Sequence, residues 1–157
     1  MAVTTYAVAL GSNRRGRAGA PERVVTAALA ELAPVSASRI MRSAPLGPSS
    51  RRFANAVALV ESTDAPPAML ARLKRLERAS GRRPGRRWGA RVLDLDLVLW
   101  SGGTWAGPRF RVPHSAFRDR RFVLDPLAEV ASGWRDPVTG LTVRQLAARL
   151  RRPRPAG

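Results

Sequence analysis

Alternating apolar and polar positions between residues 91 and 99 predict a β-strand with two different faces. Leucine occupies every second position from 93 to 99, and aspartate occupies two of the positions between them. Successive side chains of an extended chain point to opposite sides. One face is therefore expected to hold Leu93, Leu95, Leu97 and Leu99. The other is expected to display Asp94 and Asp96, together with Val92 and Val98.

Other apolar runs, each bounded by turn-forming residues, predict strands at 3–10, 36–43 and 53–60. Apolar residues at helical spacing predict helices at 21–33 and 66–80. Both helices open with proline, whose missing N–H costs nothing in the first turn of a helix. Strands and helices therefore alternate through the first two thirds of the chain.

Loops and short elements make up the rest of the sequence. Residues 44–48 contain two prolines and a glycine, and residues 81–90 contain three glycines, one proline and four arginines. Both segments are expected to be loops, the second of them flexible and basic. Residues 101–103 predict a tight turn into a short hairpin, and helices are expected at 122–130 and 143–150.

The order β-α-β, β-α-β favours a particular fold class. It is typical of an α/β (α+β) fold with a ferredoxin-like, split β-α-β arrangement, in which helices pack on one face of a mostly antiparallel sheet. A chain of 157 residues without an obvious linker favours a single domain, 1–157. We expect residues 151–157 to form a frayed tail.

Composition excludes several kinds of site. The chain has no cysteine and one histidine, so disulfides, thiolate metal sites and a histidine-based zinc site are ruled out. No segment is long and apolar enough for a membrane span, and the N-terminus lacks a basic stretch followed by an apolar one. We therefore expect a soluble cytoplasmic protein.

A formal net charge of +17 favours a polyanionic partner, either a nucleoside triphosphate or nucleic acid. Alternatively, the charge could come from a genome biased toward arginine codons, which would put arginine on every solvent-exposed face. The distribution is more informative, because arginines crowd both sides of the two aspartates. Those before them are Arg75, Arg78, Arg82, Arg83, Arg86, Arg87 and Arg91, and those after them are Arg109, Arg111, Arg118, Arg120 and Arg121.

Two carboxylates on one strand face can hold a hard cation. Cα atoms two residues apart on a strand are separated by about 6.5 Å. At that distance Asp94 and Asp96 could converge on one Mg²⁺ or bridge two ions about 3.5 to 4 Å apart. The surrounding arginines would then flank a triphosphate. The pattern therefore predicts a metal-assisted phosphate site, although a solvated strand face would show the same alternation.

Several motifs, in order along nearly the whole chain, carry a family resemblance. They are Leu10-Gly11-Ser12-Asn13, Ala44-Pro45-Leu46-Gly47, Phe53-Ala54-Asn55, Glu77 with Gly81-Arg82, Arg87-Trp88-Gly89 with Arg91, Asp94-Leu95-Asp96, Val112-Pro113-His114, and Arg120-Arg121-Phe122 with Pro126-Leu127. The sequence resembles the 6-hydroxymethyl-7,8-dihydropterin pyrophosphokinases of folate biosynthesis. The resemblance implies a Mg²⁺-dependent diphosphokinase that transfers the β,γ-pyrophosphoryl unit of ATP to the pterin's hydroxymethyl oxygen and releases AMP.

The resemblance also implies roles for individual residues. Asp94 and Asp96 would bind two Mg²⁺ ions, and Arg82 and Arg91 would act with them in catalysis. The residues implied to contact ATP are Glu77, Arg82, Arg83, Arg87, Trp88, Arg91, Leu97, Arg109, Arg111, His114 and Arg120. Those implied to contact the pterin are Ser43, Ala44, Pro45, Leu46, Phe53, Asn55, Asp94 and Phe122. In this scheme Phe53 and Phe122 sandwich the pterin, and Trp88 folds over the site as part of a mobile loop.

Alternatives remain open at several positions. Phe53 and Phe122 could be core residues, Asn55 could satisfy a strand edge, and His114 could be a hydrogen-bonding loop residue. Glu77 could simply neutralise the basic residues near it on its helix. The chain also departs from the family pattern at Ala90, Ser115 and Arg121, and its basic loop is one residue shorter.

Two other functions are compatible with the basic composition. One is a nucleic-acid-binding α/β domain, and the other is a relative that has lost catalysis. Two adjacent carboxylates among arginines argue against a nucleic-acid surface, because they repel phosphate unless a metal intervenes. Retention of both aspartates, Arg82, Arg91 and His114 argues against lost catalysis. We therefore predict an enzyme acting on ATP and a pterin, as a monomer.

Overall fold

A computed structural model describes residues 2–43, 52–81 and 92–152. Its elements follow in the order β1 (Thr4–Ser12), α1 (Pro21–Leu32), β2 (Ser36–Ala37), β3 (Met41–Ser43), β4 (Phe53–Ser62), α2 (Pro66–Ala79), β5 (Asp94–Trp100), β6 (Trp105–Ala106), β7 (Arg111–Val112), the short 3₁₀ helix η1 (Phe117–Asp119), α3 (Arg121–Ala131) and α4 (Val143–Arg151). The predicted site residues outside the described ranges are Ala44, Pro45, Leu46, Arg82, Arg83, Arg87, Trp88 and Arg91. None of the described helices is long and apolar enough to cross a membrane.

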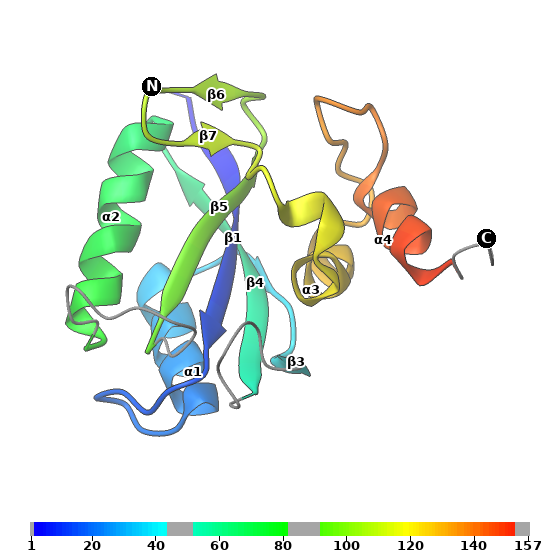
Figure 1. The fold of residues 1–157 in the computed structure, drawn as a ribbon. Helices are drawn as coiled ribbons and strands as arrows, with labels where there is room; N and C mark the ends of the chain where they lie inside the picture. Colours follow the sequence, from blue (N-terminus) through cyan, green and yellow to red (C-terminus); the bar gives the residue numbers. More distant parts are fainter. Residues whose placement is uncertain (1, 44–51, 82–91, 153–157) are drawn as a thin grey trace.

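The main sheet has five strands, and every pair in it is antiparallel. Strand β1 lies at the centre between β4 and β5, and the outer edge of β4 pairs with both β2 and β3. The first β-α-β unit is β1-α1-β2 and the second is β4-α2-β5. In the order β2-β4-β1-β5, strands of the two units alternate. This is the split arrangement that the order of elements predicts, and the predicted α/β fold is confirmed (Figure 1).

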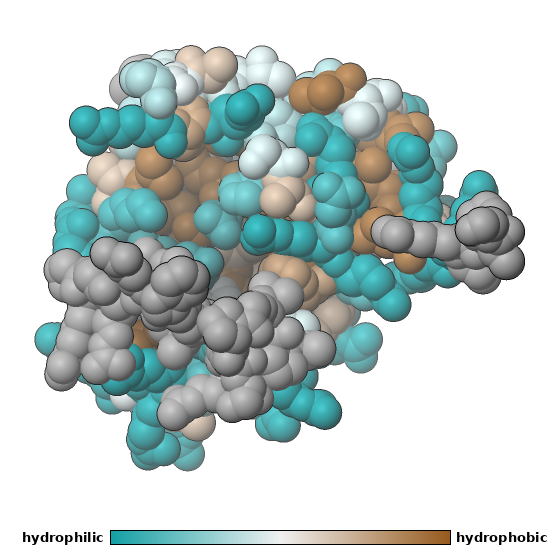
Figure 2. All heavy atoms as spheres, in the orientation of Figure 1, coloured by the Kyte–Doolittle hydropathy of each residue, from teal (hydrophilic) through white to brown (hydrophobic). Residues whose placement is uncertain are grey.

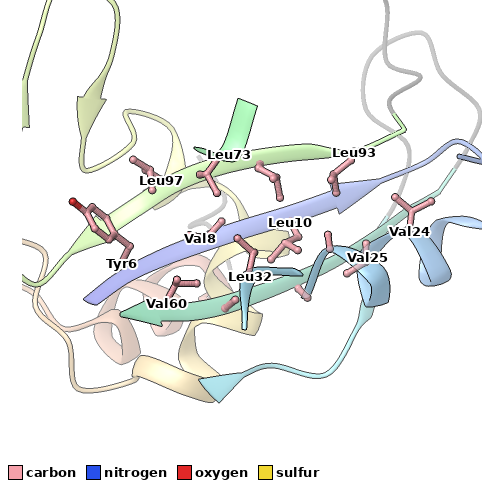
Figure 3. Packing of buried hydrophobic residues seen from close by; sticks show 14 of the residues in the cluster. Tyr6, Val8, Leu10, Val24, Val25, Leu32, Val60, Leu73, Leu93 and Leu97 are labelled. Carbon is pink, nitrogen blue, oxygen red and sulfur yellow. The ribbon is translucent and has the colours of Figure 1, made fainter. Parts of the chain in front are cut away.

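Helices cover both faces of the sheet, so the prediction that they share one face was wrong. Figure 1 shows α1 and α2 on one side of the sheet and α3 and α4 on the other. The reason lies in β1, where both alternating sets of side chains are apolar. Tyr6, Val8 and Leu10 pack in a cluster with α1 and α2 (Figure 3), whereas Ala7 and Ala9 pack in a second cluster with α3 and α4. A strand without a polar face needs cover on both sides.

An irregularity in β5 changes which side chains share a face. In the pairing with β1, Val8 lies opposite Leu97 but Ala7 lies opposite Leu99, so Val98 is an extra residue. Such a bulge shifts the alternation by one residue. Leu99 consequently packs in the α3–α4 cluster with Val98, and not with the other leucines as predicted.

The leucine face is otherwise as expected. Leu93, Leu95 and Leu97 pack in the cluster under α1 and α2. Val92 was predicted on the aspartate face, but it precedes the strand and packs in this same cluster. Asp94 and Asp96 lie before the bulge and remain on the opposite face, as predicted. Hydrophilic residues form much of the outer surface seen in Figure 2.

Candidate active site

A pocket lies on the α3 side of the sheet, where β1, β4 and β5 meet the segment that leads into α3. Its lining residues are Ala9, Leu10, Gly11, Phe53, Asn55, Asp94, Asp96, Arg120, Phe122 and Val123. Six of the predicted site residues are therefore brought together from two strands, β4 and β5, and the start of α3. They are Phe53, Asn55, Asp94, Asp96, Arg120 and Phe122.

The strand register explains why these side chains converge. Gly11 of β1 pairs with Asn55 on one side and with Asp94 on the other. Two residues earlier, Ala9 pairs with Asp96 in the same way. Because the central strand carries only hydrogen and a methyl group here, the space between the flanking polar side chains stays open. Ala9 and Gly11 form the pocket floor, a role that sequence reasoning missed because it depends on register.

The two aspartates share a partly enclosed environment. The Asp96 side chain is 38% exposed. Burial raises the pKa of Asp96, the neighbouring Asp94 carboxylate raises it further, and His114 and Arg120 partly offset both effects. A carboxylate pair of this kind is stabilised in its ionised form by a bound cation.

His114 lies beside the edge of β5 that does not pair with β1. Its backbone N–H donates to the carbonyl of Val98 at 3.1 Å, and its Nδ1 accepts from the N–H of Ala116 at 3.2 Å. The neutral ring therefore carries its proton on Nε2, which lies 3.8 Å from Oδ1 of Asp96. The imidazole thus presents a donor, or a positive charge, to the aspartate side of the pocket.

Arg120 and Phe122 close the pocket opposite the sheet. The Arg120 guanidinium carbon lies 5.6 Å from the centre of the Phe122 ring, within range of a cation–π contact. Phe122 also packs against the α3–α4 cluster. Phe122 therefore lines the pocket, as expected, and also packs partly in the core, as the alternative interpretation had it.

Asn55 is held in one orientation. It is 4% exposed, and its Nδ2 donates to the Ser43 hydroxyl at 2.7 Å. Its Oδ1 faces Gly11, where a Cβ on the glycine would lie 3.5 Å from that oxygen. Ser43 was predicted to contact the pterin, which stays a prediction; in the structure its side chain orients an amide that lines the pocket.

Other predicted ATP contacts lie away from the pocket. Leu97 is buried in the cluster on the opposite face, and Arg109 and Arg111 are exposed on and beside the β6–β7 hairpin. Glu77 reaches β5 from α2, also from the opposite side, and its carboxylate accepts the N–H of Leu95. The structure does not bring these four residues to the pocket, and their contact with ATP stays a prediction.

The donor set fits one class of cation. In the ranges that the structure describes, no three acidic, histidine or cysteine residues form a group able to hold a metal alone. Mg²⁺ does not need such a cage, because it keeps several waters and binds through one or two carboxylates plus substrate phosphates. Asp94 and Asp96 supply carboxylate oxygens of this kind in one pocket.

Comparison with known proteins gives a consistent family. The model for 7,8-dihydro-6-hydroxymethylpterin-pyrophosphokinase (HPPK) matches residues 7–132. The 2-amino-4-hydroxy-6-hydroxymethyldihydropteridine pyrophosphokinase of Haemophilus influenzae is 36% identical over 137 residues, which cover 83% of this chain and 82% of that protein. The enzyme of the same name from Pseudomonas aeruginosa is 39% identical over the same coverage. That from Methylorubrum extorquens is 35% identical over 153 residues, or 94% of each chain. This chain belongs to the 7,8-dihydro-6-hydroxymethylpterin-pyrophosphokinase family.

Proposed function

We propose that the pocket between β1, β4, β5 and α3 is where this protein carries out its family's reaction. The enzyme transfers the pyrophosphoryl group of ATP to hydroxymethyldihydropterin, a step of folate biosynthesis. The observation that carries the assignment is that two carboxylates suited to Mg²⁺ line one pocket with two aromatic rings and a fixed amide. Such a pocket can hold a flat heterocycle beside a phosphate-bound cation.

Phe53, Phe122 and Asn55 bind the pterin in this proposal. Aromatic rings favour stacked contact with a flat heterocycle. Asn55 presents its Oδ1 toward Gly11, because Ser43 accepts from its Nδ2. An amide fixed in this way offers an acceptor to the donor groups on the pterin edge. The floor of Ala9 and Gly11 leaves the ring room to lie against the sheet.

Asp94 and Asp96 would hold Mg²⁺, as two ions on the expectation from the family. Bound there, the ions would neutralise charge on the phosphates and orient them toward the acceptor hydroxyl. The hydroxymethyl oxygen forms a bond to the β-phosphorus, the bond from that phosphorus to the α-phosphate oxygen breaks, and the hydroxyl proton is released. AMP leaves with the electron pair of the broken bond.

Positive side chains complete the phosphate environment. Arg120 lines the pocket, and His114 lies beside Asp96. Both can donate to phosphate oxygens, where charge-assisted hydrogen bonds are strong. Arg82, Arg83, Arg87 and Arg91 lie outside the described ranges, and their phosphate contacts are part of the proposal. Gly81 and Val92 flank that segment and lie close together, with 3.9 Å between a Cβ built on Gly81 and Cγ1 of Val92.

Two broader parts of the proposal concern the whole protein. The first is that the protein is a monomer. We also propose a cytoplasmic location, where ATP is supplied. Analytical ultracentrifugation tests the first point, and a dimer at working concentration would contradict it.

The decisive experiment follows AMP release with ATP, Mg²⁺ and hydroxymethyldihydropterin. Asp96→Asn removes a charge from the proposed metal site, and we expect the rate to fall about 100-fold or more. Asp125→Asn is the matched control, because Asp125 is a carboxylate of α3 whose ion pairs are with Arg121 and Arg151. It should retain the parent rate. AMP formation at the parent rate by Asp96→Asn would contradict the metal assignment.

A further inference from the structure

Glu77 occupies a core position on α2. It follows Met69 and Leu73 at a spacing of four residues, and all three are buried against the sheet. Its side chain is 1% exposed. A carboxylate is costly to bury unless it is paired or hydrogen-bonded, so a charged residue at an apolar helical position needs a specific partner.

One partner is the backbone of the strand that carries both aspartates. Oε2 of Glu77 accepts the N–H of Leu95 at 2.9 Å. Leu95 lies between Asp94 and Asp96, and β5 is the last strand in the sheet order. Among the described residues, the sheet has no further strand beyond β5 to accept this N–H, and the Glu77 carboxylate accepts it instead. Lys74, one turn earlier on α2, lies 3.4 Å from the other carboxylate oxygen and offsets the buried charge.

We propose that Glu77 is a positioning residue that sets the separation of the Asp94 and Asp96 carboxylates by fixing the strand backbone between them. This inference rests on the proposed role of both aspartates as metal ligands. Metal–oxygen distances tolerate deviations of about 0.2 Å, so a small displacement of the backbone at Leu95 would spoil the geometry. Partners outside the ligand shell commonly change metal affinity when they are removed.

An ordinary anchoring role for Glu77 gives a different expectation. If the contact only fastened α2 to the sheet, its loss would lower the free energy of unfolding and leave metal affinity unchanged. The test must therefore measure metal binding directly. Mn²⁺ is a suitable probe, because its binding can be followed by electron paramagnetic resonance with a non-hydrolysable ATP analogue present. Binding of the analogue without metal is measured beside it, because a direct contact between Glu77 and ATP would weaken that binding too.

Three variants separate the possible contributions. Glu77→Met keeps the length of the side chain and removes the acceptor. Glu77→Gln keeps an acceptor oxygen and removes the charge. Lys74→Ala removes the cation and leaves the bond to Leu95 in place. Asp136→Asn serves as a stability control, because it breaks the Arg118–Asp136 ion pair beside the α3–α4 cluster, on the other face of the sheet from Glu77.

We expect Glu77→Met to weaken Mn²⁺ binding about tenfold and to speed hydrogen exchange of the Leu95 amide. Glu77→Gln should stay within about threefold of the parent, and Lys74→Ala and Asp136→Asn should match it. Parent affinity in Glu77→Met would overturn the proposal. Equal losses in Glu77→Gln and Glu77→Met would also overturn it, because charge and not the hydrogen bond would then be responsible.

A second measurement needs no variant at position 77. In the parent protein, bound Mn²⁺ and ATP analogue should slow exchange of the Leu95 amide, because coupling between the two is reciprocal. The amide of Val57, held by the Ser38 hydroxyl at 2.9 Å, is the control. Unchanged exchange at Leu95 would overturn the proposal. The metal assignment fails separately if Asp94→Ala with Asp96→Ala binds Mn²⁺ like the parent.

Discussion

Asn55 shows how a single hydroxyl can determine what a pocket recognises. A primary amide has a donor end and an acceptor end, and only its surroundings decide which end faces a ligand. Here the Ser43 hydroxyl binds the donor end at 2.7 Å, so the acceptor end faces Gly11. If Asn55 binds the pterin edge as proposed, recognition of that edge depends on Ser43, a residue that does not line the pocket.

Replacing Ser43 by alanine tests this dependence. The amide loses its shorter hydrogen bond and keeps only the carbonyl of Phe53 at 3.5 Å. A lost hydrogen bond costs about 1 kcal/mol, equivalent to about a fivefold change in affinity. We expect KM for the pterin to rise about fivefold, with KM for ATP unchanged. Ser132→Ala, at the exposed end of α3, is the matched control. An equal rise in both KM values would indicate a general loosening of the site.

At the scale of elements, a buried ion pair ties η1 to the turn before α4. Asp136 is fully buried and accepts two hydrogen bonds from Arg118, one of them at 2.9 Å from Nη2. It also accepts from the Thr139 hydroxyl at 2.7 Å and from the N–H of Val138 at 3.0 Å. These contacts, the Arg118 bond foremost, lower the pKa of Asp136 from 3.8 to about 2.

The lowered pKa predicts a pH dependence of stability. A carboxyl with a depressed folded-state pKa contributes fully above its unfolded pKa, near pH 4, and loses this contribution as the pH falls toward about 2. The shift corresponds to about 2 kcal/mol. We expect Asp136→Asn to lower the free energy of unfolding by at least about 2 kcal/mol at pH 7, measured in urea. The difference from the parent should shrink between pH 4 and pH 2. A constant difference across that range would argue against the ion pair.

The sequence predicted most elements because their patterns are local. Prolines placed the starts of α1 and α2, and the alternation through residues 93–97 placed the aspartates on the correct face. The bulge at Val98 depends on pairing with β1, so alternation alone could not show that Leu99 changes face. The cover of both faces was indicated by the uninterrupted apolar run of β1, which was interpreted only as a strand.

The candidate site was predictable in its chemistry but not in its construction. Side-chain types and motif order indicated Asp94, Asp96, Asn55 and the aromatic rings. The pocket floor of Ala9 and Gly11 depends on strand register, which no single segment encodes. Glu77 showed the same limit, because its hydrogen bond to Leu95 joins segments eighteen positions apart through tertiary packing.

At the scale of the whole molecule, the net charge of +17 should act on the two substrates unequally. ATP is a polyanion attracted by a positive field, whereas the pterin is a largely uncharged heterocycle. Salt screens such fields over about 10 Å at 0.1 M. Raising KCl from about 50 mM to about 300 mM should increase KM for ATP several-fold and that for the pterin less than about twofold. Equal salt sensitivity of both would show that the net charge does not select for ATP.

The central position of β1 also bears on how the protein forms during synthesis. The first strand made is flanked by β4 and β5, and its partner Asp94 is added more than eighty residues after Gly11. Until then one edge of an apolar strand has no neighbour, a state that invites association with other chains. Pairing across such long sequence separations also slows folding. Gly11 lies between Asn55 and Asp94 because β1 is the central strand. The same central position delays assembly of the pocket until β5 has been synthesised.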